Sequence, residues 1–279
     1  MLRVYIPTKN RADIISTHRV LDGFDWQVVV HDEQQRAAYL GGGIPEDRIV
    51  VSNTPGDVFG LTRQREFVCR QLVKPGEWFL FADDNVKEFV AVDDAHWRYG
   101  ELPVQDGRDW NPVFKASCDN ERLQSRLEEC IEVAEKTGAC VVGFATTDNY
   151  FFLGKKYRQV GYVIGKVMLW KNDPSFSFDH TITMEDFRNT AQHLLQFGCV
   201  LVCNYIIPRA NHYQHGGMGS YDERLSWRLQ DVKMLLKQYP GLFRVHDRKG
   251  FAYGSDLSIK LSNLKQVSAW RRSLLGGQP

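Results

Sequence analysis

Short apolar runs alternate with amphipathic segments along the first part of the chain. The runs that predict buried strands lie at 2–6, 28–30, 47–52 and 78–81. Between them, residues 13–21 and 61–73 have the spacing of apolar positions that is typical of helices. Strands that alternate with helices predict an α/β protein whose central sheet is mainly parallel.

The middle of the chain is less regular. Residues 86–116 show no clear period, and we interpret them as an excursion from the sheet. Residues 120–136 predict an amphipathic helix with Gly138 as its C-cap. Three later apolar runs predict strands, namely "ACVVGFAT", "YVIGKVMLW" and "CVLVCNYII", the last one stopped by Pro208. The segment "TMEDFRNTAQHLLQFG" predicts a helix that ends at Gly198.

The last part of the chain begins after a polar, glycine-rich segment, "NHYQHGGMG". Ser220 and Glu223 then have the spacing of a capping box at the start of a long helix. We find no internal repeat and no low-complexity linker. The pattern therefore predicts one α/β domain over residues 1–219, with a helical extension over 220–279 that packs on the same domain.

Composition narrows the class of protein. The chain has 279 residues with a net charge of +1, which gives no strong overall field for nucleic acid or membranes, although a local basic groove stays open. No apolar run approaches the roughly 18 residues of a membrane span, and no signal peptide precedes the first strand. The six cysteines lack CxxC spacing, which favours reduced thiols over zinc or disulfides. We therefore expect a cytoplasmic protein that makes no membrane contact.

Two adjacent acids come shortly after the apolar run at 78–81. They are Asp83 and Asp84, and Asn85 comes next. Aspartates and asparagine are common in solvated turns, so a simple surface turn is one interpretation. A bound cation is the other, because Mg²⁺ and Mn²⁺ prefer oxygen ligands and open α/β sheets bind ligands beyond the carboxyl ends of their strands.

Three segments, in this order, resemble a known family. "VYIPTKNRADII", "VVVHDE" and "GLTRQREFVCRQLVKPGEWFLFADDN" are similar to the opening segments of family-2-like glycosyltransferases of the GT-A fold. The resemblance covers residues 1 to about 90, and residues 91–175 do not share it. It implies a Rossmann-like, mainly parallel mixed sheet with helices on both faces. It also implies a donor-binding half over about 1–90 and an acceptor half over about 91–219.

The resemblance assigns roles to residues of the donor half. Asp84 would bind Mn²⁺ or Mg²⁺ directly, and Asp83 would share the ion or hold the ribose, so that the metal offsets the repulsion between the two acids. The residues that would contact the donor, a UDP-sugar, are Pro7, Thr8, Asn10, Arg11, Asp32, Arg65 and Asp83. Two departures from the family pattern are Asn85, in place of the last acid, and Glu66, in place of the asparagine after Arg65.

Plainer interpretations of the same donor-half residues stay open. Asp32 has the position of a surface turn acid. The segment from Thr8 to Arg11 could cap a helix and then expose its charges. Arg65 could lie on the solvated face of an arginine-rich helix.

A later segment, "ITMEDFRNTAQHL", resembles the Glu-Asp motif that faces the acceptor in many of these enzymes. By this resemblance Asp186, or failing that Glu185, is the general base for the acceptor hydroxyl. The alternative is that both acids only interact favourably with a helix dipole. His215, in preference to His212, would complete the metal site, and the alternative is a solvated loop histidine.

The acceptor is suggested by the segment from Met184 to Gly219. It is most similar to the TET/JBP-associated glycosyltransferases of phages and fungi, which are proposed to glycosylate oxidised pyrimidines in DNA. This implies a DNA acceptor that carries 5-hydroxymethylpyrimidine, and a host-cell cytoplasm if a phage encodes the chain. Candidate acceptor contacts are the aromatic residues Trp97, Tyr99, Trp110 and Phe114 and the basic residues Lys155, Lys156, Arg158, Arg271 and Arg272.

Three other functions stay open at this point. The same chemistry could act on a glycan or small-molecule acceptor. The chain could be a nucleotide-binding module without catalysis. A nucleotidyltransferase would also pair carboxylates with Mg²⁺, but the chain lacks the glycine- and lysine-rich triphosphate loop expected of one.

Overall fold

A computed structural model describes residues 1–57, 59–92, 118–145, 147, 153, 156–178, 182–210, 221–246 and 256–259. Its central feature is a mixed sheet of eight strands in the order β3-β2-β1-β4-β8-β6-β9-β7. These strands are β1 Arg3–Pro7, β2 Asp25–Val30, β3 Ile49–Val51, β4 Trp78–Ala82, β6 Val141–Phe144, β7 Tyr157–Arg158, β8 Val167–Lys171 and β9 Leu201–Cys203. The predicted α/β class is therefore confirmed.

Strands β1 to β4 form the parallel part of the sheet. The chain runs outward from β1 to β2 and β3, and then returns to place β4 on the other side of β1. β8 is antiparallel to both β4 and β6, whereas β9 is parallel to β6. The strand order thus changes direction between β1 and β4. In open α/β sheets, a crevice beyond the carboxyl ends of the strands at such a point is the usual place for a ligand.

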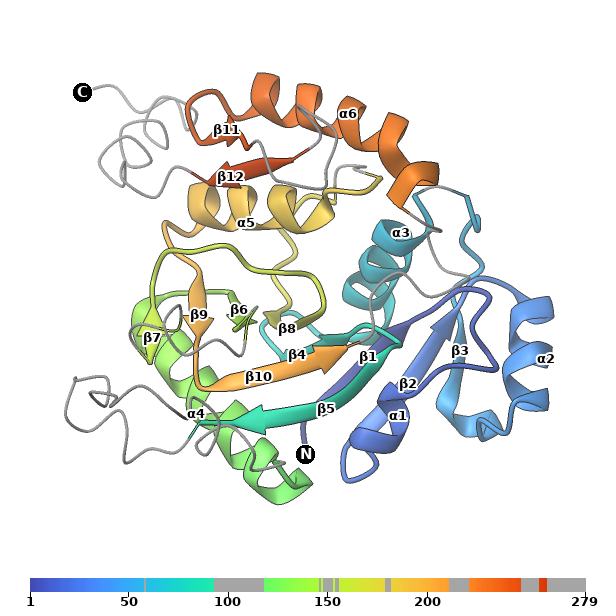
Figure 1. Cartoon of the computed structure of the whole chain (residues 1–279). Coiled ribbons are helices and arrows are strands. Elements are labelled where there is room, and N and C mark those ends of the chain that lie inside the picture. Colours follow the sequence, from blue (N-terminus) through green and yellow to red (C-terminus); the bar gives the residue numbers. More distant parts are fainter. Residues whose placement is uncertain are drawn as a thin grey trace, which may run out of the picture.

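Successive side chains of a strand point alternately into two separate hydrophobic cores. In β4, for example, Leu80 belongs to one core and Phe81 to the other. The first core also contains Tyr39 of α2 (Glu33–Gly41) and Leu127 of α4 (Asn120–Thr137), and the second contains Phe187 of α5 (Glu185–Gln196) and Leu235 of α6 (Tyr221–Gln238). Figure 1 shows α3 (Gly60–Phe67), α5 and α6 on one side of the sheet and α4 on the other. Helices therefore cover both faces, as expected.

The helices differ from those predicted from the sequence mainly in the segment between β1 and β2. Their bounds are α1 Thr17–Val20, α2 Glu33–Gly41, α3 Gly60–Phe67, α4 Asn120–Thr137, α5 Glu185–Gln196 and α6 Tyr221–Gln238, with a 3-10 turn at Glu46–Arg48 and a π-helical turn at Val68–Leu72. The helix predicted over 13–21 is reduced to α1. The Ser16 N–H donates to Asp84 O at 3.0 Å and its hydroxyl donates to Val86 O at 2.9 Å, so this segment bonds to the turn after β4 and to the residue that follows it instead. Gly138 caps α4 with φ 75°, as predicted.

Two predictions about strands were wrong. Residues with no clear period contain β5, Val86–Ala91, and the run "CVLVCNYII" is divided between β9 and β10, Ile206–Ala210. β5 and β10 pair with each other in an antiparallel two-stranded sheet. Pro208 does not stop the strand but lies inside β10, which a proline tolerates where a strand has a free edge. The pairing of segments so distant in sequence is what the local pattern could not indicate.

The C-terminal extension contains more than a helix. After α6, strands β11 Phe243–Val245 and β12 Leu257–Ile259 form an antiparallel pair. Leu235 and Phe243 pack into the second core, so that α6 and β11 contact the same sheet as α5. Ser220 lies outside the described residues. Of the helices that the structure describes, none combines the length and hydropathy of a membrane span.

Candidate functional site

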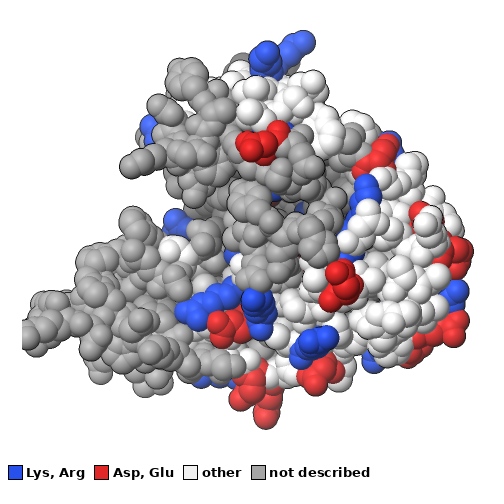
Figure 2. Space-filling model, turned by 45° about the vertical axis from the view of Figure 1, so that its right-hand side comes forward, with Lys and Arg blue, Asp and Glu red and all other residues white. Residues whose placement is uncertain are grey.

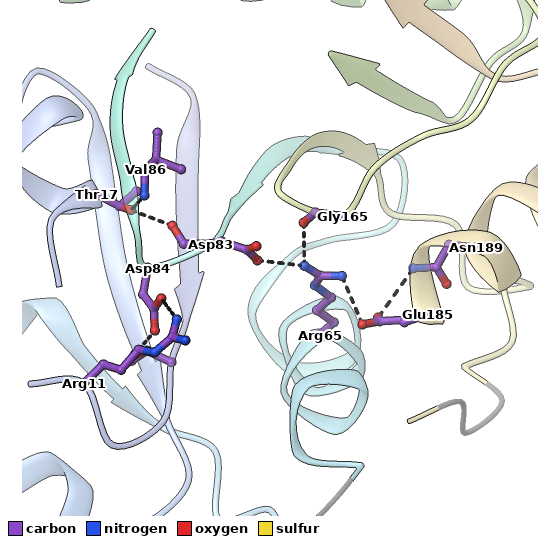
Figure 3. A network of polar contacts seen from close by, with 10 residues as sticks. Arg11, Thr17, Arg65, Asp83, Asp84, Val86, Gly165, Glu185 and Asn189 are labelled. Atoms are coloured by element: carbon purple, nitrogen blue, oxygen red, sulfur yellow. Dashed lines mark hydrogen bonds and ion pairs between the residues drawn. The ribbon is translucent and has the colours of Figure 1, made fainter. Parts of the chain in front are cut away.

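The two adjacent acids after β4 point in opposite directions (Figure 3). Asp84 is buried, and both of its carboxylate oxygens are engaged. Arg11 donates from Nη1 to Oδ1 at 2.6 Å, and the Thr8 hydroxyl donates to Oδ2 at 2.6 Å. The carbonyl of Asp83 accepts from the Thr17 hydroxyl at 2.5 Å, which holds the turn between β4 and β5 against α1. In this structure the charge of Asp84 is therefore balanced by Arg11.

The loop after β1 is held beside Asp84 by hydrogen bonds to a side chain of α2. The Tyr39 hydroxyl lies 2.5 Å from the Thr8 hydroxyl and accepts a hydrogen bond from the Arg11 N–H at 3.1 Å. Burial raises the pKa of Tyr39 to about 12, so the phenol keeps its proton at neutral pH. Thr8 is thus a partner of Asp84 and not a helix cap. The first helix begins at Thr17, after Ser16.

Asp83 is the more open of the two acids. Its side chain keeps 37% of its surface exposed, and Arg65 Nη2 lies 3.4 Å from its Oδ1. Burial of the carboxyl on its remaining sides raises its pKa to about 7, with Asp84 and Glu185 adding to the rise and Arg65 opposing it. The Asp83 N–H donates to Lys166 O at 2.7 Å, which fixes the start of β8 beside it. The charge of Asp83 is therefore balanced by Arg65, and its carboxylate remains partly exposed.

Arg65 joins this acid to the start of α5. From the helix α3 its guanidinium donates to Glu185 Oε2 at 3.0 Å and to Gly165 O at 2.8 Å, in addition to Asp83 (Figure 3). Only 2% of the Arg65 side chain is exposed. The interpretation of Arg65 as part of a solvated helix face is therefore wrong. Contact of Arg65 with a donor stays a prediction.

The first turn of α5 contains two acids in different environments. Glu185 is buried and paired with Arg65. Asp186 is half-buried, and it accepts from the Tyr162 hydroxyl at Oδ2 and from the Phe187 N–H at Oδ1, 3.0 Å away. Burial raises the pKa of Asp186, and the hydrogen bond from Tyr162 lowers it in part. Asp186 is thus the more exposed acid of this pair, and its raised pKa increases its basicity.

The segment that leads into α5 is held by α6. The Asp231 carboxylate, in a residue only 4% exposed, accepts from the backbone N–H groups of Ile182, Thr183 and Met184 at 3.2, 2.6 and 3.1 Å. The Thr183 hydroxyl donates to the same oxygen at 2.9 Å. One side chain of the C-terminal extension therefore fixes the residues immediately before Glu185 and Asp186.

We expect the Asp231→Ala variant to lower the free energy of unfolding by about 2–3 kcal/mol, because it leaves one buried and two partly buried backbone donors without their charged acceptor. Chemical denaturation measures this loss. Asp222→Ala, at an exposed position of the same helix, is the control and should change the free energy by less than about 0.5 kcal/mol. Equal stability of the two variants would remove the support that we assign to Asp231.

The other residues expected to contact the donor lie along the same edge of the sheet. Pro7 ends β1. Asn10 is exposed, has φ 54°, and accepts a hydrogen bond from Gln35. Asp32 follows β2, where it is exposed and accepts from the Gln35 N–H at 2.8 Å as the N-cap of α2. These residues lie at or beyond the carboxyl ends of β1 and β2, and no nucleotide contact is needed to explain their hydrogen bonds.

Several expected site residues lie outside the described residues. They are His212, His215, Trp97, Tyr99, Trp110, Phe114, Lys155, Arg271 and Arg272. Of the basic residues that are described, Lys156 pairs with Glu129 at 2.8 Å and Arg158 is exposed on β7. The histidine contribution to a metal site therefore stays a prediction.

The acidic side chains of the site offer few free ligands for a divalent cation. Within the described ranges, no group of three or more His, Cys, Asp or Glu side chains could hold a metal ion. Asp83 offers an open carboxylate, whereas both oxygens of Asp84 are occupied. Mg²⁺ is commonly held by one or two carboxylates, water and substrate phosphates. The site therefore fits a cation that takes most of its ligands from a substrate, and it does not fit an all-protein cage.

Some residues of the site were not indicated by the sequence. Tyr162, Gly165, Lys166 and Asp231 all contact the acidic residues or their supporting segments. Gly165 packs closely on this site, because a Cβ there would lie 3.3 Å from Arg65 Nη1. The sequence offers one sign of these contacts, the pair Gly165-Lys166 directly before an apolar run. The same pair is also typical of an ordinary turn before a strand.

Comparisons with known proteins do not identify a family. No family model matches the chain, and a search of curated proteins found no similar sequence. The functional argument consequently rests on the residues described above.

Proposed function

We propose that the protein is a metal-dependent glycosyltransferase that moves a sugar from a nucleotide-sugar to a hydroxyl group. The observation that carries this proposal is the bridge made by Arg65. It joins Asp83, at the end of the strand expected to bind the donor, to Glu185, in the helix expected to face the acceptor. One acid of each pair predicted from the sequence thus contacts the same buried guanidinium.

The arrangement of the sheet supports a nucleotide donor. The residues expected to contact it follow β1, β2 and β4, whose carboxyl ends share one edge of the sheet. A GT-A fold, with a donor-binding half over about 1–90, agrees with this parallel part and with the change of strand order between β1 and β4. We infer a UDP-sugar because the exposed carboxylate of Asp32 can accept from the N–H of a uracil.

The open carboxylate of Asp83 is the proposed protein ligand of Mn²⁺ or Mg²⁺. Asp84, which we first expected to bind the ion directly, would instead hold Arg11 and Thr8 in place beside the donor. The metal, when bound, neutralises the diphosphate and stabilises the charge that develops on the departing nucleoside diphosphate. Arg65 keeps Asp83 oriented and limits the rise of its pKa.

Asp186 is the proposed general base. It would accept the proton of the acceptor hydroxyl as the oxygen attacks the anomeric carbon and the bond from that carbon to the diphosphate breaks. Its raised pKa makes the carboxylate a stronger base, and Tyr162 holds one oxygen in place. Glu185 is less suitable, because it is buried and already compensates Arg65.

The proposed acceptor is 5-hydroxymethylpyrimidine in DNA, and a glycan or small molecule is the second candidate. A base within a duplex would have to leave the stack to reach Asp186, at a cost of a few kcal/mol. On the face shown in Figure 2, lysine and arginine side chains alternate with acidic ones among the described residues and do not form one continuous basic area. This distribution favours the second candidate, whereas the resemblance of residues 184–219 favours DNA.

Transfer of labelled sugar tests both the reaction and the acceptor. The enzyme is incubated with Mn²⁺, a panel of nucleotide-sugars, and either hydroxymethylated DNA, unmodified DNA or oligosaccharides. We expect a sugar adduct on nucleosides from the hydroxymethylated DNA alone, detected by mass spectrometry. An adduct on oligosaccharides only would assign the acceptor to the second candidate. Metal-dependent nucleotide binding without transfer to any acceptor would favour a nucleotide-binding module.

A further inference from the structure

Lys166 is a buried, charged residue beside Asp83, and the hydrogen bonds among the described residues do not fully satisfy its ammonium group. It lies directly before β8, and its carbonyl accepts the Asp83 N–H at 2.7 Å. The residue is 9% exposed. Its ammonium makes one hydrogen bond among the described residues, a long one of 3.4 Å to Pro208 O.

Burial of the Lys166 ammonium disfavours folding of the protein without a ligand. An ammonium group has three donors, and burial of a charge disfavours folding unless the group is paired and hydrogen-bonded. Burial lowers the pKa of Lys166, and Asp83 is the charge that opposes this effect. No ion pair within 4.0 Å joins Lys166 to Asp83 in the described part of the chain, so that two opposite charges lie near one another without direct contact.

We propose that Lys166 binds a phosphoryl oxygen of the donor diphosphate, whose metal ion is held by Asp83. This inference rests on the proposed function and adds a residue to it. A bare anion would be repelled by Asp83, and a bare cation by Lys166. A metal-bound diphosphate presents both signs at neighbouring atoms, so it satisfies both side chains at once.

The chemistry of lysine agrees with this ligand. Lysine binds phosphate as a compact point charge, without the planar fork that arginine presents to a carboxylate. Arg65 and Arg11 are already committed to acidic side chains of the site. Lys166 can therefore bind a substrate anion without breaking an ion pair to any of the described residues.

The test compares ligands with and without phosphates. Calorimetry measures the binding of UDP with Mn²⁺, and ligand-observed NMR measures the binding of uridine, to the wild type and to Lys166→Met. We expect the variant to bind UDP about 10- to 100-fold more weakly, which corresponds to one charge-assisted hydrogen bond, and to bind uridine unchanged. The control is Lys171→Met, on the same strand but paired with Glu135 at 2.9 Å, which should bind UDP as the wild type does.

The outcomes separate this inference from the proposed function. Equal UDP affinity of Lys166→Met and wild type overturns the role of Lys166 and leaves the proposed function in place. An equal loss for UDP and uridine also overturns it, because a distorted fold would produce that result. A wild type that binds no nucleoside diphosphate with Mn²⁺ overturns both. Thermal unfolding checks the fold, and Lys166→Gln is measured in the same way if the methionine variant does not fold.

Discussion

Replacing Arg65 with methionine is expected to lower the free energy of unfolding by about 3–5 kcal/mol, because the buried Glu185 carboxylate loses its only guanidinium partner among the described residues. Transfer activity should disappear as well. Asp83 loses the charge that opposes the rise of its pKa, and so more of it is protonated at neutral pH and less of it can bind a cation. Chemical denaturation and the labelled-sugar assay measure the two effects.

A second substitution separates the charge of Glu185 from other consequences of losing Arg65. In the double variant Arg65→Met with Glu185→Gln, the buried negative charge is absent, and most of the lost stability should return. Transfer should not return, since Asp83 still lacks its arginine. A double variant no more stable than Arg65→Met alone would contradict the assignment of the stability to the Arg65–Glu185 pair.

Replacing Asp186 with asparagine is expected to lower turnover by about 10²- to 10⁴-fold, because the amide cannot accept the proton of the acceptor hydroxyl. Binding of the donor nucleotide should be unchanged, since the residues expected to hold it lie at the ends of β1, β2 and β4. Steady-state kinetics with saturating donor measures the loss, and calorimetry with UDP and Mn²⁺ checks the binding. A variant with wild-type turnover would move the role of base to another residue.

The pH dependence gives an independent check on Asp186. Wild-type turnover should rise with pH as the carboxyl, whose pKa is raised by burial, loses its proton. Tyr162→Phe removes a hydrogen bond that lowers this pKa, so the rise should move to higher pH while donor binding stays the same. A profile that does not move would show that Tyr162 and Asp186 are not linked in the reaction.

The sequence pattern predicted the elements whose own residues give a clear signal. β1 and β4 are apolar runs that are almost wholly buried, β2 ends in the buried run 28–30, and α4 has both an amphipathic period and a glycine cap. β5 was not recognised and β10 was not separated from β9, because the local pattern does not show that β5 and β10 pair with each other. The short length of α1 was not predicted for the same reason, since the serine before it bonds to the turn after β4 and to the first residue of β5.

The candidate site shows the same division. The acids themselves were identified from short motifs, since two carboxylates after a buried strand are chemically conspicuous. Their partners were not, because Arg65 and Glu185 are 120 positions apart and Asp231 holds a segment 47 to 49 positions earlier. The difference in exposure between Asp83 and Asp84 also depends on tertiary contacts, because only the folded loop after β1 brings Arg11 to Asp84.

Calorimetry of UDP with the wild type and with Asp83→Asn, in Mn²⁺ and in chelator, tests the central claim most directly. A metal ion requires the ionised carboxylate, and the pKa of Asp83 is raised to about 7. We therefore predict that the wild type binds UDP with Mn²⁺ more tightly at pH 8 than at pH 6 and loses this affinity in chelator. Asp83→Asn should bind weakly under all of these conditions, whereas the control Asp222→Asn, at an exposed position, should behave as the wild type. Wild-type affinity that is the same in chelator, or an Asp83→Asn variant that binds as the wild type does, would contradict a metal-dependent nucleotide site.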